Sequence, residues 1–470
     1  MKGERNVKKR RLWKKWSVFC AAMATTFLLS GCMFALSPDD LYSLPKLPEE
    51  YVDLEQEIAA LVDSGYEYAA PTGGENVQPV QMVDIDGDGE DEALLFLRKS
   101  GESKPLKIYI FKQSSEGYQT AAVLEESGAS IERVDYQDMN GDGVLELIVG
   151  CRIMTGDSGI GQTEEILNER ALIRVVSVYN LERYNTQKIL EVNYNRCLIT
   201  DLDCDGAPEM IVIAGGTSGN CTASAYSWRL GALEQIASAP LSVPPAMLES
   251  VRVGGLTDGA QALFVTGVVD AENRITDLLV MENGVLVNCT MDEQSGISGL
   301  VYHAAGVEAQ DIDQDGVLEL PIPYALHKTS SIAPTYWGIR WTAFAVDGRQ
   351  TVKETTYHNP TDGWYLVLPE SWKDVLMVTS VTSAAGERIV TFGVYQGEDT
   401  DPLEVIAIYT ESGESREYKA TKGDRFILMR QATTVYAAEF LPDYSTWSGA
   451  MSADALKDGF RMIRDEWYLT

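Results

Sequence analysis

The chain has 470 residues, of which 45% are apolar, and its formal net charge at pH 7 is −32. That apolar fraction is ordinary for a folded protein and excludes a disordered acidic chain. The strongly negative charge argues against binding to nucleic acid and against lying flat on anionic lipid, since both attract basic surfaces.

The first 32 residues have the organisation of an export signal. Eight Lys and Arg residues precede the apolar stretch Trp16–Leu29, which is shorter than the ~20 residues that a membrane-spanning helix needs. The stretch ends in Leu29-Ser30-Gly31-Cys32 and resembles a bacterial lipobox. The resemblance implies a diacylglyceryl group on the Cys32 thiol and a mature protein held by lipid at the extracytoplasmic face of the cell membrane.

Residues 33–75 are predicted to form a tether followed by a short helix. Pro38, Pro45 and Pro48 stand among many polar residues, a composition typical of a linker. In Leu54–Val62 the apolar residues recur at helical spacing, which predicts a helix that caps the following domain.

One nine-residue pattern occurs four times in the next part of the chain, as loop 1 (84–92), loop 2 (138–146), loop 3 (201–209) and loop 4 (311–319). Positions 1, 3 and 5 carry a side-chain oxygen, position 6 is glycine and position 9 is glutamate. The side-chain candidates are Asp84, Asp86, Asp88, Glu92, Asp138, Asn140, Asp142, Glu146, Asp201, Asp203, Asp205, Glu209, Asp311, Asp313, Asp315 and Glu319.

Such loops suit calcium, which takes six to eight hard oxygen ligands. Alternate carboxylates can converge on one point, and the glycine permits the sharp turn that brings position 7 round. The position-7 carbonyl oxygens are therefore further candidate ligands, from Glu90, Val144, Ala207 and Val317. Because crowded carboxylates repel one another without a cation, the pattern predicts about four calcium sites.

The loops are not EF-hands, which need a glutamate at position 12 and a helix on each side. Short apolar runs follow position 9 instead, and these indicate buried strands. They are Ala93–Leu97, Leu147–Val149, Met210–Ile213 and Leu320–Ile322. The predicted unit is thus a calcium loop that leads into a strand.

The spacing of the loops indicates a fifth, degenerate copy. Loops 3 and 4 stand about twice as far apart as the others, and Leu256–Val265 falls between them with Asp258-Gly259 and an apolar strand. Gly254, Leu256 and Ala262 replace the ligands at positions 1, 3 and 9, so this copy is expected to bind no metal. A repeat of 50–60 residues built from strands and glycine turns is the size of a four-stranded propeller blade.

Taken together, the loops resemble FG-GAP or VCBS-type repeats, the calcium-loop blades of integrin α-subunit propellers. The resemblance covers roughly residues 76–357 and implies a mainly β fold, a propeller of five or six blades, with metal ligands at the positions named above. An open or irregular β-solenoid is the alternative architecture. Residues 358–470 change in character and predict a small α+β domain, with a final helix that Ser452 caps.

Nothing in the sequence indicates a catalytic centre. The histidines, His303, His327 and His358, show no zinc-hydrolase spacing. Gly156–Gly159 matches the segment around a serine-protease nucleophile, but a glycine-rich hairpin explains it better, since no histidine stands in a matching context. The five cysteines after Cys32 show no disulfide framework, although one bridge is possible outside the cell.

We therefore expect a non-enzymatic, surface-anchored module, stabilised by calcium, that binds or scaffolds an unknown protein or glycan ligand at the cell surface. The alternative is a secreted polysaccharide hydrolase or lyase that uses the propeller as its catalytic frame. That activity would require an acid/base pair of carboxyl groups in a cleft.

Overall fold

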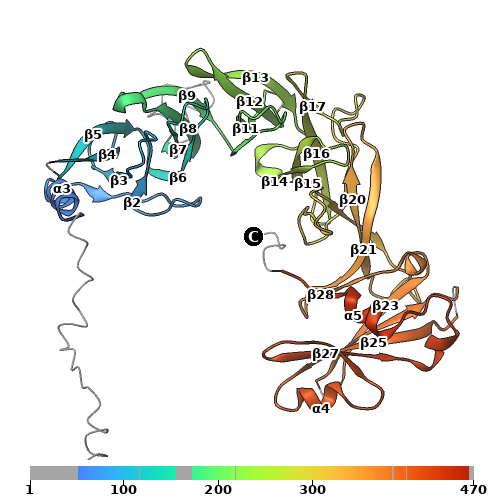
Figure 1. The fold of residues 1–470 in the computed structure, drawn as a ribbon. Coiled ribbons are helices and arrows are strands. Elements are labelled where there is room, and N and C mark those ends of the chain that lie inside the picture. Colours follow the sequence, from blue (N-terminus) through green and yellow to red (C-terminus); the bar gives the residue numbers. More distant parts are fainter. Residues whose placement is uncertain are drawn as a thin grey trace, which may run out of the picture. The chain divides into compact units, whose positions relative to one another are not determined.

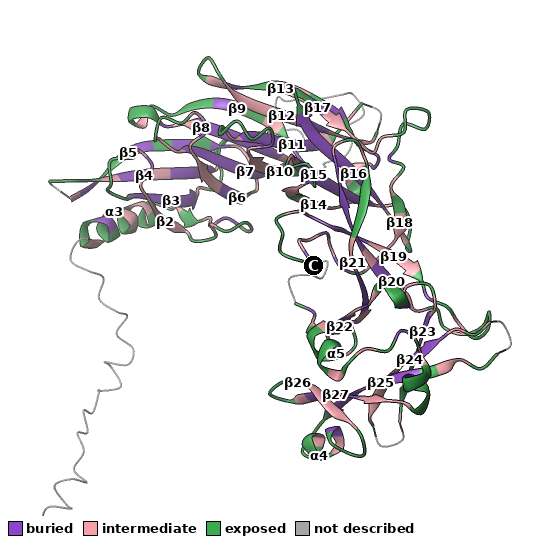
Figure 2. Ribbon diagram, turned by 45° about the vertical axis from the view of Figure 1, so that its right-hand side comes forward, coloured by how far each residue is buried: buried purple, intermediate pink, exposed green. Residues whose placement is uncertain are grey.

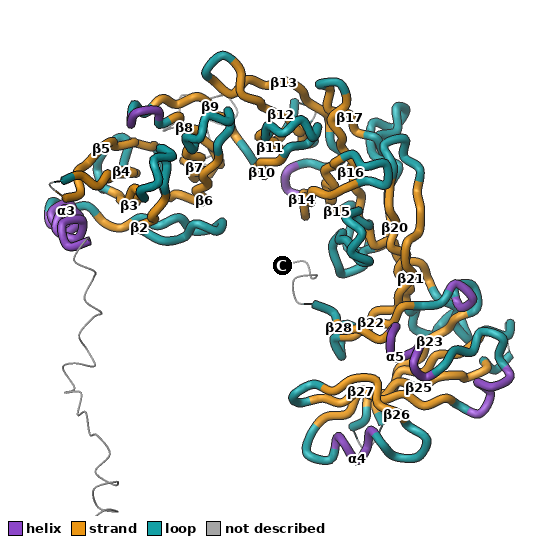
Figure 3. The backbone as a smooth tube through the Cα atoms, viewed as in Figure 1, coloured by secondary structure: helices purple, strands orange, loops and turns teal. Residues whose placement is uncertain are grey.

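The computed structural model describes residues 51–115, 117–154, 172–217, 219–383, 386–397 and 400–464. The export signal, Cys32, the proline-rich tether and the Gly156–Gly159 segment lie outside these residues. The described chain is mainly β, and its helices are few and short (Figure 3). Among the described residues no helix is long and apolar enough to cross a membrane.

The residues divide into two compact units. The smaller unit contains α3 (Val52–Asp63) and the segment 113–119. Within it the Tyr51 ring stacks on Tyr118 with 6.3 Å between ring centroids, and Leu54 is buried. The helix predicted from the apolar spacing is therefore present, two residues longer at its start and one at its end.

The larger unit contains six antiparallel sheets that follow one another along the chain (Figure 1). The first two sheets consist of β1 (Glu67–Tyr68), β2 (Val80–Val83), β3 (Glu92–Arg98), β4 (Leu106–Ser114) and β5 (Gly117–Glu126), then β6 (Ser130–Gln137), β7 (Glu146–Met154), β8 (Leu172–Asn180) and β9 (Gln187–Asn193). The third and fourth consist of β10 (Arg196–Thr200), β11 (Glu209–Gly215), β12 (Cys221–Arg229) and β13 (Ala232–Pro240), then β14 (Leu248–Gly255), β15 (Gln261–Val268), β16 (Asn273–Glu282), β17 (Val285–Asn288) and β18 (Val301–His303).

The fifth sheet has the order β19-β20-β21-β22-β28 and the sixth the order β23-β24-β25-β27-β26. Their strands are β19 (Leu320–Ala325), β20 (Trp337–Phe344), β21 (Gln350–Asn359), β22 (Trp364–Val367), β23 (Leu376–Thr382), β24 (Arg388–Val394), β25 (Leu403–Ser412), β26 (Phe426–Arg430), β27 (Thr434–Phe440) and β28 (Phe460–Met462). The short helices are η3 (Glu182–Tyr184), η4 (Pro245–Met247), η5 (Glu370–Trp372), η6 (Pro442–Thr446), α4 (Arg416–Ala420) and α5 (Ala453–Gly459).

Each of the first four sheets repeats one meander, in which the nine-residue loop or its degenerate copy joins two consecutive strands: β2 to β3, β6 to β7, β10 to β11 and β14 to β15. The strand that follows the loop is called the second strand of the meander. The second strands, β3, β7, β11 and β15, are buried on nearly every residue (Figure 2). Burial on both faces explains why these strands read in the sequence as continuous apolar runs and not as alternating ones. All four strands predicted after loops 1 to 4 are confirmed, and each begins at position 9 or 10.

Neighbouring sheets share their apolar cores. One cluster joins the first and second sheets through Phe96 and Val149, and the next joins the second and third through Ile148 and Met210. Further clusters join the third to the fourth and the fourth to the fifth sheet. The second, third and fourth sheets are thus each packed between their sequence neighbours, and no closed barrel or propeller is found among the residues that the structure describes.

The C-terminal part is not separated from the repeats at residue 358. The expected boundary falls inside β21, and β28 returns to pair with β22, with Met462 opposite Trp364. The sixth sheet, with α4 and α5, is the segment between those two strands. Ser452 caps α5 as predicted, since its side chain accepts a hydrogen bond from the Ala455 amide.

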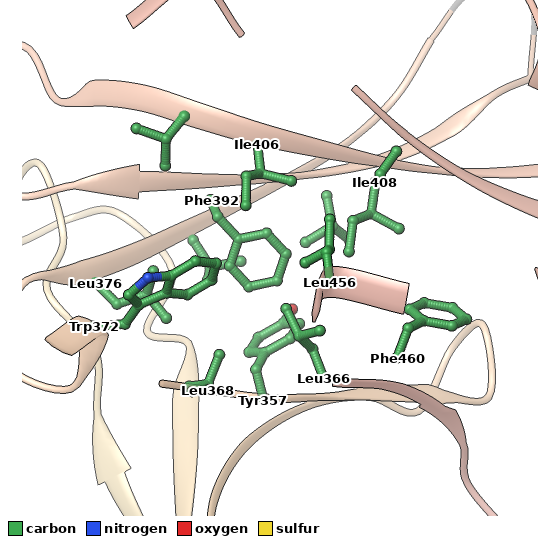
Figure 4. Close-up of a cluster of buried hydrophobic side chains, with 14 of the residues drawn as sticks. Tyr357, Leu366, Leu368, Trp372, Leu376, Phe392, Ile406, Ile408, Leu456 and Phe460 are labelled. Atoms are coloured by element: carbon green, nitrogen blue, oxygen red, sulfur yellow. The ribbon is translucent and has the colours of Figure 1, made fainter. Parts of the chain in front are cut away.

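A large aromatic cluster joins the fifth and sixth sheets. Trp372, Phe392 and Leu456 converge at its centre (Figure 4), and all three are fully buried. The indole N–H of Trp372 donates to the Gly449 carbonyl at 2.8 Å, which satisfies its one polar group.

Candidate metal-binding loops

Loops 1 to 4 share one hydrogen-bond pattern. The position-1 carboxylate accepts from the position-6 amide, at 3.0, 2.9, 2.9 and 2.8 Å in loops 1 to 4. The position-5 carboxylate accepts from the position-7 amide, at 2.9, 2.8, 2.8 and 2.9 Å. These bonds fold each loop so that its alternate side chains face the same interior.

The backbone turns through the left-handed region at two places in each loop. Position 6 is always glycine, as the sequence pattern requires, with φ between 88° and 93°. Position 4 is also left-handed, and there loops 3 and 4 carry Cys204 at φ 59° and Gln314 at φ 64°. Side chains are strained in this region. Only loops 1 and 2 signal this second turn in the sequence, because they have Gly87 and Gly141 at position 4.

Position 2 anchors each loop in a core. Its residue is Ile85, Met139, Leu202 or Ile312, and each is 5% exposed or less. Sequence reasoning assigned no role to these residues, although an apolar side chain between two acidic ones was a visible signal. A buried position 2 holds the acidic positions 1 and 3 at the surface of the sheet stack.

The position-9 glutamates are buried at the base of the loops, with exposed fractions of 0 to 2%. In every loop one carboxylate oxygen accepts a hydrogen bond from the position-2 amide, at 3.0, 2.8, 2.9 and 3.1 Å. The second oxygens of Glu92 and Glu319, Oε1 in both, are buried and have no hydrogen-bond partner, and the same holds for Oδ1 of Asp84 in loop 1. A buried carboxylate oxygen without a partner is costly unless a cation completes it.

Burial raises the pKa of all four glutamates, and the nearby aspartates of each loop raise it further. For Glu319 the pKa rises to about 7. Each loop therefore holds more negative charge than its surroundings stabilise. A bound cation would stabilise this charge.

Three of the four loops bring three carboxylates within 4.8 Å of one another and could hold a metal ion. The groups are Asp84, Asp86 and Glu92 in loop 1, Asp201, Asp203 and Glu209 in loop 3, and Asp311, Asp313 and Asp315 in loop 4. Loop 2 has the amide of Asn140 at position 3, and Asn140 donates to Asp142 at 3.0 Å. The predicted position-7 carbonyl ligands lie in the same loops, and their role stays a prediction.

Two lysines reach the loops from neighbouring strands. Lys112 of β4 lies 2.6 Å from Asp86 and 2.7 Å from Asp88, and Lys353 of β21 pairs with Asp315. The hydrogen bonds to Asp86 and Asp88 raise the pKa of Lys112. For Asp88 the hydrogen bond from Lys112 is the main reason that the carboxyl pKa is lowered. Sequence spacing did not reveal either lysine, since each comes from a different strand.

Successive loops also contact each other through the backbone. The position-8 amide of Leu145 donates to the position-2 carbonyl of Ile85, and the same bond joins Leu318 to Gly255 of the degenerate copy, each at 2.9 Å. The degenerate copy keeps the turn, but its aspartate bonds outside the loop. Asp258 accepts from the Val346 amide at 2.9 Å, and Leu256 at position 3 is buried.

A cleft of about 980 Å³ lies beside loop 4. Its lining includes Arg252, Arg461, Tyr365 and Phe460 together with Asp311 and Asp313. Arginine and aromatic side chains of this kind are common in ligand sites.

The histidines and cysteines form no reactive group among the described residues. His303 stacks on Trp337 and His327 on Tyr395, with 4.0 and 4.3 Å between ring centroids. Cys151, Cys197, Cys204, Cys221 and Cys289 are free thiols. Burial raises the pKa of Cys221 and Cys289 to about 11, so these thiols are protonated and unreactive at neutral pH.

No protein-family model matches the chain, and no curated protein sequence does. Among solved structures the chain is similar to a Bacillus licheniformis rhamnogalacturonan lyase, at 13% identity and a TM-score of 0.25, covering 72% of this chain and 71% of that one. It is also similar to an exo-β-1,3-galactanase from Phanerochaete chrysosporium, at 10% identity and a TM-score of 0.25, covering 77% and 82%. A hypothetical protein from Leishmania major has 10% identity and a TM-score of 0.17, covering 72% and 90%. Scores this low carry no argument about fold or function.

Proposed function

We propose that this protein is a membrane-anchored extracytoplasmic lipoprotein whose repeat domain is stabilised by calcium and serves as a binding or scaffold module. The anchor would be the lipid on Cys32, by the likeness to a lipobox. The ligand would be a protein or a glycan at the cell surface.

The observation that carries the proposal is the buried glutamate at position 9 of every loop. Each glutamate gives one oxygen to a backbone amide. In loops 1 and 3 the glutamate also lies within 4.8 Å of two aspartates, whereas the second oxygen of Glu146 in loop 2 accepts from Asn180. The donors are all oxygens, with no imidazole or thiolate in the three carboxylate groups. Hard oxygen sets of this kind favour calcium over zinc or copper.

The sheet series supports blade-like repeats. A repeated four-stranded meander, with the loop before its buried second strand and a core shared with each neighbour, is the arrangement that FG-GAP or VCBS-type blades would have. We propose a propeller of such blades, with an open solenoid as the alternative. The cleft beside loop 4 supports a binding role, because it combines arginines and aromatic rings.

Thermal unfolding with and without a chelator tests the role of calcium. With a Kd of about 0.1 mM, 1 mM calcium would stabilise the protein by about 1.4 kcal/mol for each occupied site. We expect a clearly lower Tm in chelator, restored by calcium and poorly by magnesium, which demands octahedral geometry. An identical Tm in calcium and in chelator would overturn the calcium proposal, and depolymerisation of a glycan by the purified protein would overturn the non-enzymatic one.

A further inference from the structure

Strand register assigns one residue in each sheet to face the position-9 glutamate. The residues at position 10 pair with Phe111, Tyr179, Tyr226 and Thr342 on the next strand. In an antiparallel pair, the residue that follows each of these four partners stands opposite position 9. The residues opposite position 9 are Lys112, Asn180, Ser227 and Ala343.

These four facing residues differ in charge. Asn180 donates to Glu146 at 3.0 Å and brings no charge to loop 2. Ser227 and Ala343 bring none to loops 3 and 4. Only Lys112 places an ammonium at this register position, so the loops differ in a residue that lies outside the nine-residue pattern.

The Lys112 ammonium contacts three of the loop-1 carboxylates at once. It lies 2.6 Å from Asp86, 2.7 Å from Asp88 and 3.7 Å from Glu92. The Tyr184 hydroxyl donates to the same oxygen of Asp86 at 2.6 Å. Lys112 and Tyr184 thus engage oxygens that a metal ion in loop 1 would need.

Loop 3 has the opposite character. Within the described chain, no ion pair involves Asp201, Asp203 or Glu209, and their carboxylates gather without a cation. Loop 4 is intermediate, because Lys353 pairs with Asp315 but comes from β21 and not from the strand that faces Glu319.

We propose that Lys112 is a built-in substitute for the metal ion in loop 1, where its ammonium takes the place that a divalent cation would take in loop 3. The inference rests on the proposed calcium role and refines it. An ammonium and a divalent ion repel each other, and both need the same carboxylate oxygens, so the two occupants exclude one another. The residue facing position 9 would then decide which loops bind metal.

Counting bound calcium on the purified full chain by equilibrium dialysis tests this assignment. Lys112→Met should bind about one more ion per chain than the unmodified protein, and Ser227→Lys about one fewer. The matched control is Lys188→Met, since Lys188 has the same 31% side-chain exposure as Lys112 and also bridges two carboxylates, Glu126 and Glu191, but away from any loop. Its calcium count should not change.

The outcomes separate the two proposals. If the unmodified protein binds no calcium, the calcium role itself is wrong. If it binds calcium and Lys112→Met leaves the count unchanged, the substitute role of Lys112 is wrong. Circular dichroism confirms folding of each variant, and Ser227→Lys keeps the inference falsifiable if Lys112→Met does not fold, because an unchanged count in Ser227→Lys would overturn it independently.

Discussion

The Ile312 amide donates to Oε2 of Glu319 at 3.1 Å, while Oε1 of the same carboxylate is buried without a hydrogen-bond partner. Oε2 therefore closes loop 4 through its hydrogen bond to the backbone, and the charge on the carboxylate lies near the aspartates of the loop. The hydrogen bond and the buried negative charge make different contributions to stability, and a substitution can separate the two.

Glu319→Gln should stabilise the protein in chelator and should reduce the stabilisation that calcium provides. The amide oxygen still accepts from Ile312, but the buried negative charge is gone, so in chelator the variant should be more stable than the unmodified protein by about 1–3 kcal/mol. In calcium it should gain less stability than the unmodified protein, since one ligand is weakened. Thermal melts under both conditions measure this. Glu282→Gln, at an exposed residue, is the control, and a variant that is destabilised equally in calcium and in chelator would contradict the ligand role.

Cys204→Gly and Gln314→Gly should each stabilise the protein. Both residues are exposed and hold a positive φ that glycine adopts without strain. We expect a gain of about 0.5–1 kcal/mol in the free energy of unfolding, the relief of strain less the added entropy of the unfolded chain. Urea denaturation in chelator removes metal effects from the measurement. A loss of stability would show that position 4 has a role other than turning the backbone.

Gly87→Ala should cost more than Gly141→Ala, although the two residues have nearly the same φ, 73° and 77°. A Cβ on Gly87 would lie 2.4 Å from the Gly143 carbonyl oxygen of loop 2, whereas a Cβ on Gly141 meets nothing within 4 Å. We expect about 1 kcal/mol for Gly141→Ala and about 2–3 kcal/mol for Gly87→Ala. Equal losses by urea denaturation would mean that loops 1 and 2 are not in contact in solution.

His358→Phe should make the protein more resistant to acid. Both ring nitrogens of His358 are buried without hydrogen-bond partners, and burial lowers its pKa to about 3. The unfolded chain takes up the proton near pH 6.5 and the folded chain does not, so stability is lost as pH falls from 6.5 towards 3, by up to ~1.4 kcal/mol per pH unit. Between pH 7.5 and 5.0 the free energy of unfolding of the variant should fall by about 2 kcal/mol less than that of the unmodified protein. His327→Phe is the control, because its ring nitrogen contacts the Asp374 carbonyl, and an equal loss in both variants would contradict the prediction.

The repeats were predictable because their signal is local. Position 9 and the apolar run after it lie within one short segment, and the structure begins β3, β7 and β11 at that glutamate. The degenerate copy was predictable for the same reason, and its Asp258-Gly259 turn does join β14 to β15.

What the sequence could not predict depends on contacts between distant strands. Lys112 reaches loop 1 from 24 and 26 residues away in the sequence, and strand register alone brings it there. The pairing of β28 with β22 joins residues almost 100 positions apart, so a boundary placed by the change in composition at residue 358 could not detect it. Neither contact leaves a periodic mark on the sequence.

The return of β28 to the edge of β22 makes the C-terminal segment an insertion and not an appendage. In such a nested arrangement, the fifth sheet can acquire β28 only after the intervening residues 368–459 have been synthesised. Loss of β28 would therefore disturb a sheet whose other strands, β19 to β22, are synthesised about 95 to 140 residues earlier. Removal of the sixth sheet would require a deletion from within the chain and not a truncation.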